Sequence, residues 1–257
     1  MWSVTLDKEK FKRWIKFITT IKDLTEEICF WITEEEIRFR DMDAARISMI
    51  DFSLENTYFL EYNYDGEEEL PICIQSKKLL EFSKLMKNAE EVTIMIDEGL
   101  THFILRTNTP YEKQLSIPIM ADKERTKPGI PDINYTARVK LVSTTLKDAL
   151  MEAKAISDRI TFMAEGNNIT FISKNDEGFQ IKNKLTYPEN LEILDINVEE
   201  RSVAVYMVKP LLSVIKELSS ISRISELLFG NALPLDLKFE LIDGENYQYF
   251  LAPRTEE

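Results

Sequence analysis

The residues most able to carry catalysis in this chain are carboxylates. Asp41 and Asp43 stand two positions apart just past a predicted strand, and Glu34–Glu36 lie a few residues upstream. Carboxylate pairs of this kind can hold Mg²⁺ and support hydrolysis of a phosphoryl bond. Because no third ligand accompanies the pair in the sequence, a metal-dependent phosphoryl hydrolase is only a distant alternative.

Other catalytic chemistry lacks the residues it needs. His102 is the single histidine, which excludes a two-histidine metal site and the HExxH motif, and we expect it to be a structural strand residue. The seven glycines form neither GxGxxG nor GxxxxGK[ST], so the usual phosphate-binding loops are absent. Cys29 and Cys73 are too few for a disulfide scaffold or a Cys-rich metal site, and we expect both to be small buried hydrophobic residues. These absences weaken most enzyme readings, and we expect no metal and no cofactor.

Composition places the chain among globular proteins. Its 257 residues are 44% hydrophobic and 30% charged, with a formal net charge of −13. That much apolar material can offset the entropy of the chain, so disorder is excluded. No window approaches the roughly 18 uncharged apolar residues of a membrane span, and the start of the sequence lacks the pattern of a secretory signal. We expect a soluble intracellular protein with no membrane partner.

An internal repeat organises the chain. At an offset of 132 residues, apolar and basic positions recur in the same order over about 70 positions. This ordered series predicts two homologous halves. The matched pairs include Ile28 with Ile160, Phe30 with Phe162, Ile37 with Ile169, Phe39 with Phe171, Lys77 with Lys209, Leu80 with Leu212, and Lys84 with Lys216.

Each half is predicted to contain strands and two helices, which makes the fold class α+β. Apolar residues at i, i+3, i+4 and i+7 predict helices, and period-2 runs predict strands with one buried face. A segment with three of the nine prolines predicts a linker. We therefore expect a first domain at 1–117, a linker at 118–134 and a second domain at 135–257. The predicted helices span 8–20, 76–87, 143–156 and 209–219, and the strands of the first half span 28–32, 37–39, 46–52, 92–96 and 102–105.

Positive charge is concentrated on the predicted helices of this acidic chain. Residues 7–22 include six basic and two acidic side chains, and residues 76–88 include four basic and one acidic. Solvated helix faces often carry lysines, but such segregation also creates a local surface for a polyanion while the remainder repels it. The third helix is an exception, because Asp148 and Glu152 balance Lys147 and Lys154.

These features together resemble the archaeal and eukaryotic sliding clamp, the proliferating cell nuclear antigen family. The similar segments are Met42-Asp43-Ala44-Ala45-Arg46-Ile47-Ser48-Met49, the Gly-Ile-Pro of the linker, Phe229–Leu235, and the ending Leu251-Ala252-Pro253-Arg254-Thr255-Glu256-Glu257. The resemblance implies a DNA-clamp fold: two halves, each an antiparallel sheet with two helices on one face, assembling into a ring. It also implies a homotrimer around duplex DNA in the archaeal cytoplasm, associated with the nucleoid when on DNA.

The resemblance further implies a processivity factor for DNA polymerase that is not itself an enzyme. It would bind a clamp loader, flap nuclease and ligase through short client peptides, in DNA replication and repair. Phosphate contacts of the helices would be non-specific and salt-sensitive. The implied DNA-binding residues are Lys12, Arg13, Lys16, Lys77, Lys84, Lys87, Lys209, Lys216 and Arg223. The implied client-peptide site under the linker comprises Met42, Ala44, Arg46, Ile47, Met49, Pro128, Ile130, Pro131, Pro234, Phe250, Ala252 and Pro253. For Ile47 and Met49, ordinary core positions on a strand are the alternative.

Subunits of this family pair edge strands, which here implies 111–117 and 178–184. The implied interface residues are Tyr111, Lys113, Leu115, Ile117, Phe179, Ile181 and Lys182. Three features depart from the family pattern: Ala44 stands where a proline is usual, the third helix has no net charge, and the linker is unusually basic at Lys123, Arg125 and Lys127. The basic linker suggests a preference for acidic client segments. A clamp subunit that works only in a ring of different chains is the alternative within this fold.

Overall fold

The computed structural model describes residues 1–120 and 126–254, and the chain folds as two compact units. The first unit comprises Met1–Ala44, Ile50–Pro128 and Ile242–Tyr247, and the second comprises Ala45–Met49, Gly129–Leu241 and Gln248–Glu257. Within the described ranges, no helix is both long enough and apolar enough to cross a membrane.

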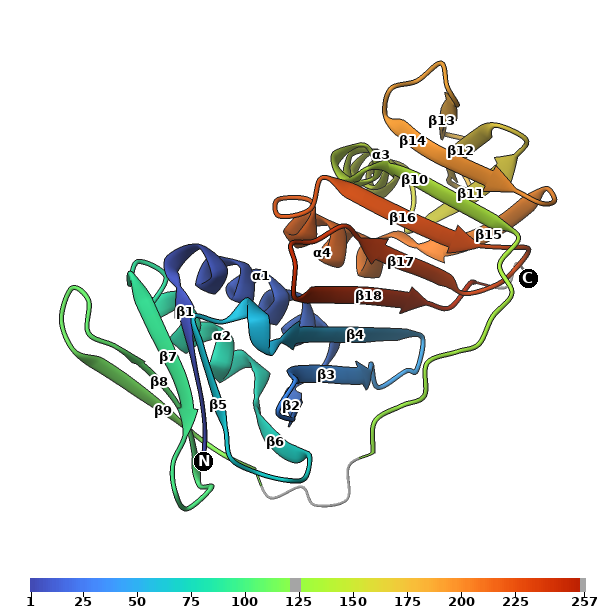
Figure 1. Ribbon diagram of the computed structural model, residues 1–257. Coiled ribbons are helices and arrows are strands. Elements are labelled where there is room, and N and C mark those ends of the chain that lie inside the picture. Colours follow the sequence, from blue (N-terminus) through green and yellow to red (C-terminus); the bar gives the residue numbers. More distant parts are fainter. Residues whose placement is uncertain (121–125, 255–257) are drawn as a thin grey trace. The chain divides into compact units, whose positions relative to one another are not determined.

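The first unit contains two antiparallel sheets and two helices (Figure 1). One sheet has the strand order β5-β1-β7-β8-β9, and the other strands follow the order β4-β3-β2-β6. The elements are β1 (Trp2–Asp7), α1 (Lys8–Leu24), β2 (Glu27–Ile32), β3 (Glu36–Met42), β4 (Ser48–Glu55), the 3-10 helix η1 (Asn56–Tyr58), β5 (Glu61–Tyr64), β6 (Leu70–Gln75), α2 (Ser76–Leu85), β7 (Glu91–Ile96), β8 (His102–Thr107) and β9 (Lys113–Pro118).

The second unit repeats this arrangement strand for strand. Its orders are β14-β10-β16-β17-β18 and β13-β12-β11-β15, which match those of the first unit position by position. The structure therefore confirms the two homologous halves and the α+β class. The elements are β10 (Ala137–Val142), α3 (Ser143–Ile156), β11 (Arg159–Glu165), β12 (Asn168–Lys174), β13 (Gln180–Thr186), β14 (Ile193–Val198), β15 (Ser202–Met207), α4 (Val208–Leu218), β16 (Ile224–Phe229), β17 (Leu235–Phe239) and β18 (Glu245–Leu251).

Helix α1 forms because its sequence supplies both a cap and a buried stripe. The side chain of Asp7 accepts a hydrogen bond from the backbone N–H of Lys10 at 2.8 Å, which satisfies one free donor of the first turn. Phe11, Trp14 and Ile18 recur at helical spacing and are buried. The helix runs to Leu24, four residues beyond the predicted end, since Ile21 continues the buried stripe.

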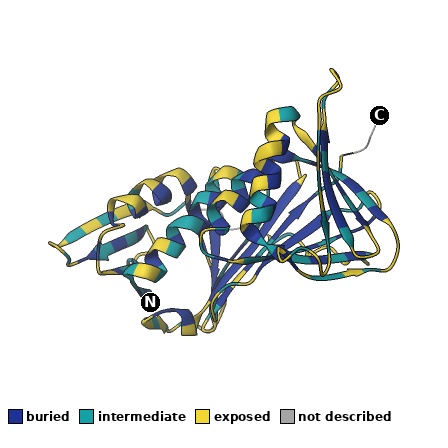
Figure 2. Cartoon of the chain, turned by 90° about the horizontal axis from the view of Figure 1, so that it is seen from above, coloured by how far each residue is buried: buried dark blue, intermediate teal, exposed yellow. Residues whose placement is uncertain are grey.

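In each unit the helices pack together over one face of the sheet. Helix α1 contacts α2, β1 and β7, and α3 contacts α4, β10 and β16. In β10 the residues Ala137, Val139 and Leu141 are buried on the helix side, while Arg138 and Lys140 alternate with them. Figure 2 shows the helices with dark blue residues on one side and yellow, exposed residues on the other.

Strand β4 begins two residues later than its period-2 pattern predicts. Arg46 has φ 56°, which is left-handed backbone, and residues 44–47 are exposed. A strand cannot pass through that conformation, so pairing starts at Ser48. Residues 44 and 45 form the turn at the position where the family resemblance leads one to expect a proline.

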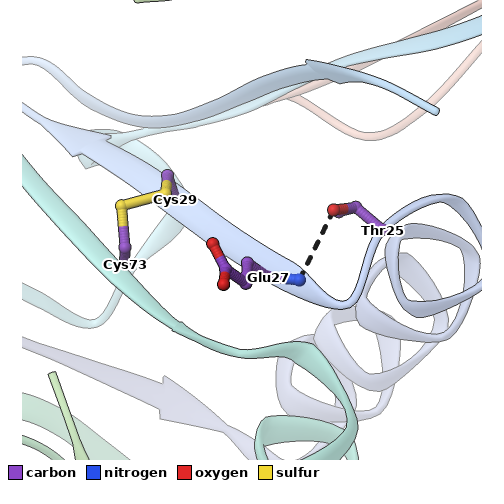
Figure 3. Close-up of a disulfide and its surroundings, with 4 residues drawn as sticks. All are labelled: Thr25, Glu27, Cys29 and Cys73. Carbon is purple, nitrogen blue, oxygen red and sulfur yellow. Dashed lines mark hydrogen bonds between the residues drawn. A yellow bond between two sulfur atoms is a disulfide. The ribbon is translucent and has the colours of Figure 1, made fainter. Parts of the chain in front are cut away.

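The expectation for the two cysteines is corrected by the structure. Cys29 and Cys73 are buried, as predicted, but they are joined in a disulfide (Figure 3). The strands β2 and β6 pair so that Cys29 lies directly opposite Cys73, with the Cα atoms 4.0 Å apart. The two residues are 44 positions apart in the sequence, so their closeness in space becomes evident only from the strand register.

Candidate DNA-facing helices and interaction surfaces

The first candidate surface is the exposed side of the helices. Of the nine residues predicted to contact DNA, seven are exposed and two, Arg13 and Lys16, are half-buried. Lys12 Nζ pairs with Glu9 at 2.6 Å within α1. The exposed residues are Lys12, Lys77, Lys84, Lys87, Lys209, Lys216 and Arg223.

Arg13 has a partner inside the protein. Its guanidinium donates through Nε and Nη2 to both carboxylate oxygens of Glu245, whose side chain has no exposed surface. Burial lowers the pKa of Arg13, but the hydrogen bond and charge of Glu245 outweigh it and leave the pKa raised. Arg13 therefore anchors residues 242–247 to α1, and its contact with DNA stays a prediction.

Helix α3 differs from the other three helices in its exposed charges. Asp148 and Glu152 are exposed, and Met151 between them is 49% exposed. Glu152 Oε2 accepts a hydrogen bond from Asn183 Nδ2 of β13 at 2.7 Å. The acidic face of α3 thus adjoins β13, a strand in which the sequence predicts subunit contacts.

Both segments predicted to join subunits lie at sheet edges. Strand β9 is last in the order of its sheet, and β13 is first in the order of its own. Tyr111 and Phe179, just before these strands, are each 62% exposed. Exposed edges carry unpaired backbone donors and acceptors that can pair with another chain. The remaining predicted residues are placed as follows: Ile117 is buried, Lys182 is exposed, and Lys113, Leu115 and Ile181 are half-buried.

On the β9 side, three lysines lie near the edge, and the acidic Glu112 is paired with Arg106 at 3.0 Å. Lys113 Nζ donates to the backbone oxygen of Leu85 at the end of α2, at 3.2 Å, and lies 5.2 Å from the ring centroid of Tyr111. Lys84 and Lys87 are exposed close by in sequence. Leu85 itself is 60% exposed. This edge therefore combines apolar surface with positive charge.

The predicted client site is divided between the two units. Met42, Ala44 and Pro128 belong to the first, and the other nine residues belong to the second. In the second unit the backbone N–H of Ala252 donates to the oxygen of Ile47 at 2.7 Å, which joins the signature segment to the C-terminal segment. Ile47 is 42% and Ile130 45% exposed. The other residues are placed as follows: Met49 and Phe250 are buried, Met42, Pro128, Pro234, Ala252 and Pro253 are half-buried, and Ala44, Arg46 and Pro131 are exposed.

The C-terminal segment is held by contacts that the sequence did not indicate. The backbone N–H of Arg254 donates to the oxygen of Val205 at 2.7 Å. Its guanidinium lies 3.0 Å from the sulfur of Met207 and 3.7 Å from a carboxylate oxygen of Asp158. Strand β15 thus fixes the segment after Leu251, which orients Ala252 and Pro253.

A buried acidic residue lies beside this segment. Asp236 pairs with Phe250 in the register of β17 and β18, and it is 3% exposed. One carboxylate oxygen accepts a hydrogen bond from Gln248 Nε2 at 2.8 Å. Burial raises the pKa of Asp236, and the hydrogen bond and the charge of Lys238 only partly oppose it.

The alternative phosphoryl hydrolase gains no support from the structure. In the described parts of the chain, no three His, Cys, Asp or Glu side chains converge as metal ligands. Asp41 lies at the end of β3, where a carboxylate oxygen accepts from the backbone N–H of Met42 at 2.8 Å. His102 begins β8 and contacts Thr101 and Asp97. The carboxylate of Asp97 accepts hydrogen bonds from Thr101 and His102, and these lower its pKa to about 2.

Comparison with known proteins matches the two parts of the chain to the two domains of one protein family. Residues 8–120 match the model of the proliferating cell nuclear antigen N-terminal domain, and residues 129–254 match that of its C-terminal domain. The chain is 30% identical to the DNA polymerase sliding clamp of Pyrococcus horikoshii over 97% of both chains. It is 28% identical to DNA polymerase sliding clamp 1 of Thermococcus kodakarensis over 96% of both.

Solved structures share the fold over the whole chain. The proliferating cell nuclear antigen of Thermococcus kodakaraensis matches with a TM-score of 0.89 at 23% identity, covering 99% of this chain and 100% of that one. The A. fulgidus protein, solved with the C-terminal region of FEN-1 bound, matches with a TM-score of 0.87 at 22% identity, covering 100% of both chains. The PCNA2–PCNA3 complex of Sulfolobus tokodaii matches with a TM-score of 0.84 at 22% identity, covering 99% of this chain and 100% of that one. The chain belongs to the proliferating cell nuclear antigen family of sliding clamps.

Proposed function

We propose that the protein is a DNA sliding clamp, a homotrimeric ring that encircles duplex DNA and tethers polymerase and other replication enzymes to it. It acts in the archaeal cytoplasm and has no catalytic role of its own. The observation that supports this best is that β9 and β13 are outermost strands of their sheets, one in each of the two homologous units.

The two exposed sheet edges can pair with each other across subunits. Strand β9 is the last strand of its sheet and β13 is the first strand of its own, so each has one unpaired side. We therefore propose that β9 of one copy pairs with β13 of the next through main-chain hydrogen bonds.

Charge supports identical rather than mixed subunits. Near the β9 edge Lys84, Lys87 and Lys113 are basic, and on the helix side of the β13 edge Asp148 and Glu152 of α3 are acidic, while β13 itself carries the exposed Lys182 and Lys184. Opposite charges on the helix sides of the two edges favour pairing of this chain with itself. A ring that needs a different clamp chain is the alternative, since the Sulfolobus tokodaii structure is a complex of two such chains.

The helices provide the surface for DNA. Lys77 and Lys209, and Lys84 and Lys216, are exposed repeat equivalents on α2 and α4. Such phosphate contacts are independent of sequence, so they permit sliding. Client peptides, exemplified by the C-terminal region of FEN-1 on the A. fulgidus relative, would insert apolar side chains beside Ile47, Ile130 and the Ala252–Pro253 segment. Polymerase, clamp loader, flap nuclease and ligase are the proposed clients.

Light scattering on a sizing column tests the assembly. A homotrimer of the 30.0 kDa chain has a molar mass of about 90 kDa, which should persist over a range of dilutions. The trimer should then lengthen the products of an archaeal replicative polymerase on primed circular DNA. A persistent monomer that becomes a ring only with a second clamp chain would establish the mixed ring. A monomer that stimulates no polymerase under either condition would contradict the proposal.

A further inference from the structure

One lysine of the linker is held against the first unit by two side chains. Lys127 Nζ lies 4.9 Å from the ring centroid of Trp31, and it forms an ion pair with Glu69. The Lys127 side chain is 28% exposed, and Trp31 is 9% exposed. A cation over the face of a tryptophan is attracted by the ring, more strongly as water is excluded.

The preceding part of the linker is fixed to the same unit. The backbone N–H of Ile119 donates to the oxygen of Thr101 at 2.8 Å, and that of Met120 donates to the oxygen of Cys73 at 2.8 Å. Cys73 lies on β6, and Trp31 lies opposite Pro71 in the pairing of β2 with β6. The linker is therefore attached to the β2–β6 pair both at Met120 and at Lys127.

We propose that Lys127 is a positioning residue for client binding, because its contacts with Trp31 and Glu69 hold this part of the linker against the first unit before a client docks. The inference rests on the client site proposed above, which includes Ile130, three residues further along the chain. A segment that is already ordered costs less to immobilise when a ligand binds.

This role differs from the charge attraction expected of a basic linker. Because the ammonium of Lys127 is already paired with Glu69, its charge serves the linker itself rather than an acidic client segment. Lys123 and Arg125 lie outside the described residues.

The test compares K127M with K127R in the full-length protein. Met keeps the aliphatic stem and removes the charge, whereas Arg can both stack on Trp31 and pair with Glu69. K78M is the matched control, since Lys78 forms another Lys–Glu pair, with Glu81 at 2.9 Å on α2. The first measurement is acrylamide quenching of tryptophan fluorescence, which reports on Trp31 because Trp2 and Trp14 are 1% and 0% exposed. The second is the affinity for a fluorescein-labelled peptide of the C-terminal region of A. fulgidus FEN-1.

We expect K127M to increase quenching and to weaken peptide binding about three- to tenfold, in keeping with a partly desolvated cation–π contact. K127R should restore both values, and K78M should change neither. Unchanged quenching in K127M, or increased quenching with unchanged or tighter binding, would overturn the inference. If the wild-type protein does not bind the peptide, the proposed client site and the client role of Lys127 both fail. Quenching then still decides whether Lys127 covers Trp31.

Discussion

The guanidinium of Arg13 on α1 holds both carboxylate oxygens of Glu245, a residue 232 positions later in the chain. The side chain of Glu245 is completely covered, and Arg13 keeps 15% of its side-chain surface. The neighbouring Tyr247 donates from its hydroxyl to Thr20 Oγ1 at 2.8 Å, also on α1. A segment near the C-terminus therefore completes the packing of the first unit.

Breaking this ion pair should destabilise the first unit. R13M leaves a buried carboxylate without its cation, a change that costs about 3–5 kcal/mol. E245Q should cost less, because the remaining guanidinium still reaches water. The measurement is chemical unfolding monitored by circular dichroism. K12M is the control, since the exposed Lys12–Glu9 pair should contribute less than about 1 kcal/mol. Equal stabilities of R13M and K12M would contradict the assignment.

Much of this architecture can be predicted from the sequence, because periodicity reports which face of an element is buried. The helix at Ser143–Ile156 matches its predicted bounds, and the two homologous halves predicted from the 132-residue offset are confirmed by their matching strand orders. Contacts set by strand register could not be predicted in this way. The Cys29–Cys73 disulfide and the place of Glu245 depend on which strands and segments become neighbours, and residue spacing along the chain does not encode that.

Among the candidate site residues, too, some could be predicted from periodicity and others could not. The exposed lysines of α2 and α4 are predictable, because helical phase separates them from the buried stripe. The exposed turn at Arg46 and the contacts of Lys127 with Trp31 and Glu69 depend on local backbone geometry and on chain segments distant in sequence.

Removing the disulfide should lower stability without changing the fold. The Cys29–Cys73 disulfide joins residues that are 44 positions apart in the sequence. The chain-entropy relation gives a stabilisation of the folded state of about 4 kcal/mol for a loop of that size. C29A/C73A should therefore unfold at lower denaturant than the oxidised wild-type protein. Two free thiols titrated in the freshly purified, denatured wild-type protein would contradict the presence of the bond.

The basic helix faces should set the salt dependence of DNA binding. K77M/K209M removes two exposed repeat equivalents and should weaken binding to a duplex severalfold at low salt. The slope of log affinity against log salt should fall by about 0.9 for each lysine that contacts a phosphate. Fluorescence anisotropy with the trimeric protein gives both values.

K140M/K174M is the matched control for that pair. Lys140 alternates with the buried residues of β10 and therefore lies on the sheet face away from the helices, and Lys174 ends β12. A loss of affinity as large as that of K77M/K209M would show that net charge, rather than the helix surface, governs binding.

Charge reversal at one edge should weaken the proposed ring. E152K places a positive charge on the α3 edge, which would then face the lysines near β9, so the trimer should dissociate at higher protein concentration. E152Q retains an acceptor for Asn183 and should have a smaller effect. Combining E152K with K113E should restore part of the stability. Light scattering over a dilution series measures each variant, and identical dissociation of E152K and wild type would place Glu152 outside the interface.

Asp236 should make stability depend on pH in the opposite sense to an ordinary paired carboxylate. Because its pKa is raised in the folded protein, the native state binds its proton more readily than the unfolded state. The charged form therefore destabilises the fold above the raised pKa, and this penalty disappears as the pH falls toward the ordinary value of 3.8. D236N removes the charge but keeps an acceptor for Gln248, so it should raise the unfolding free energy at pH 7 by about 1 kcal/mol or more. The gain should shrink near pH 4, where wild-type Asp236 is increasingly protonated. Urea unfolding at both pH values measures this, with D195N as an exposed control. A gain that stays constant between the two pH values would show that the carboxylate does not titrate as the burial of Asp236 requires.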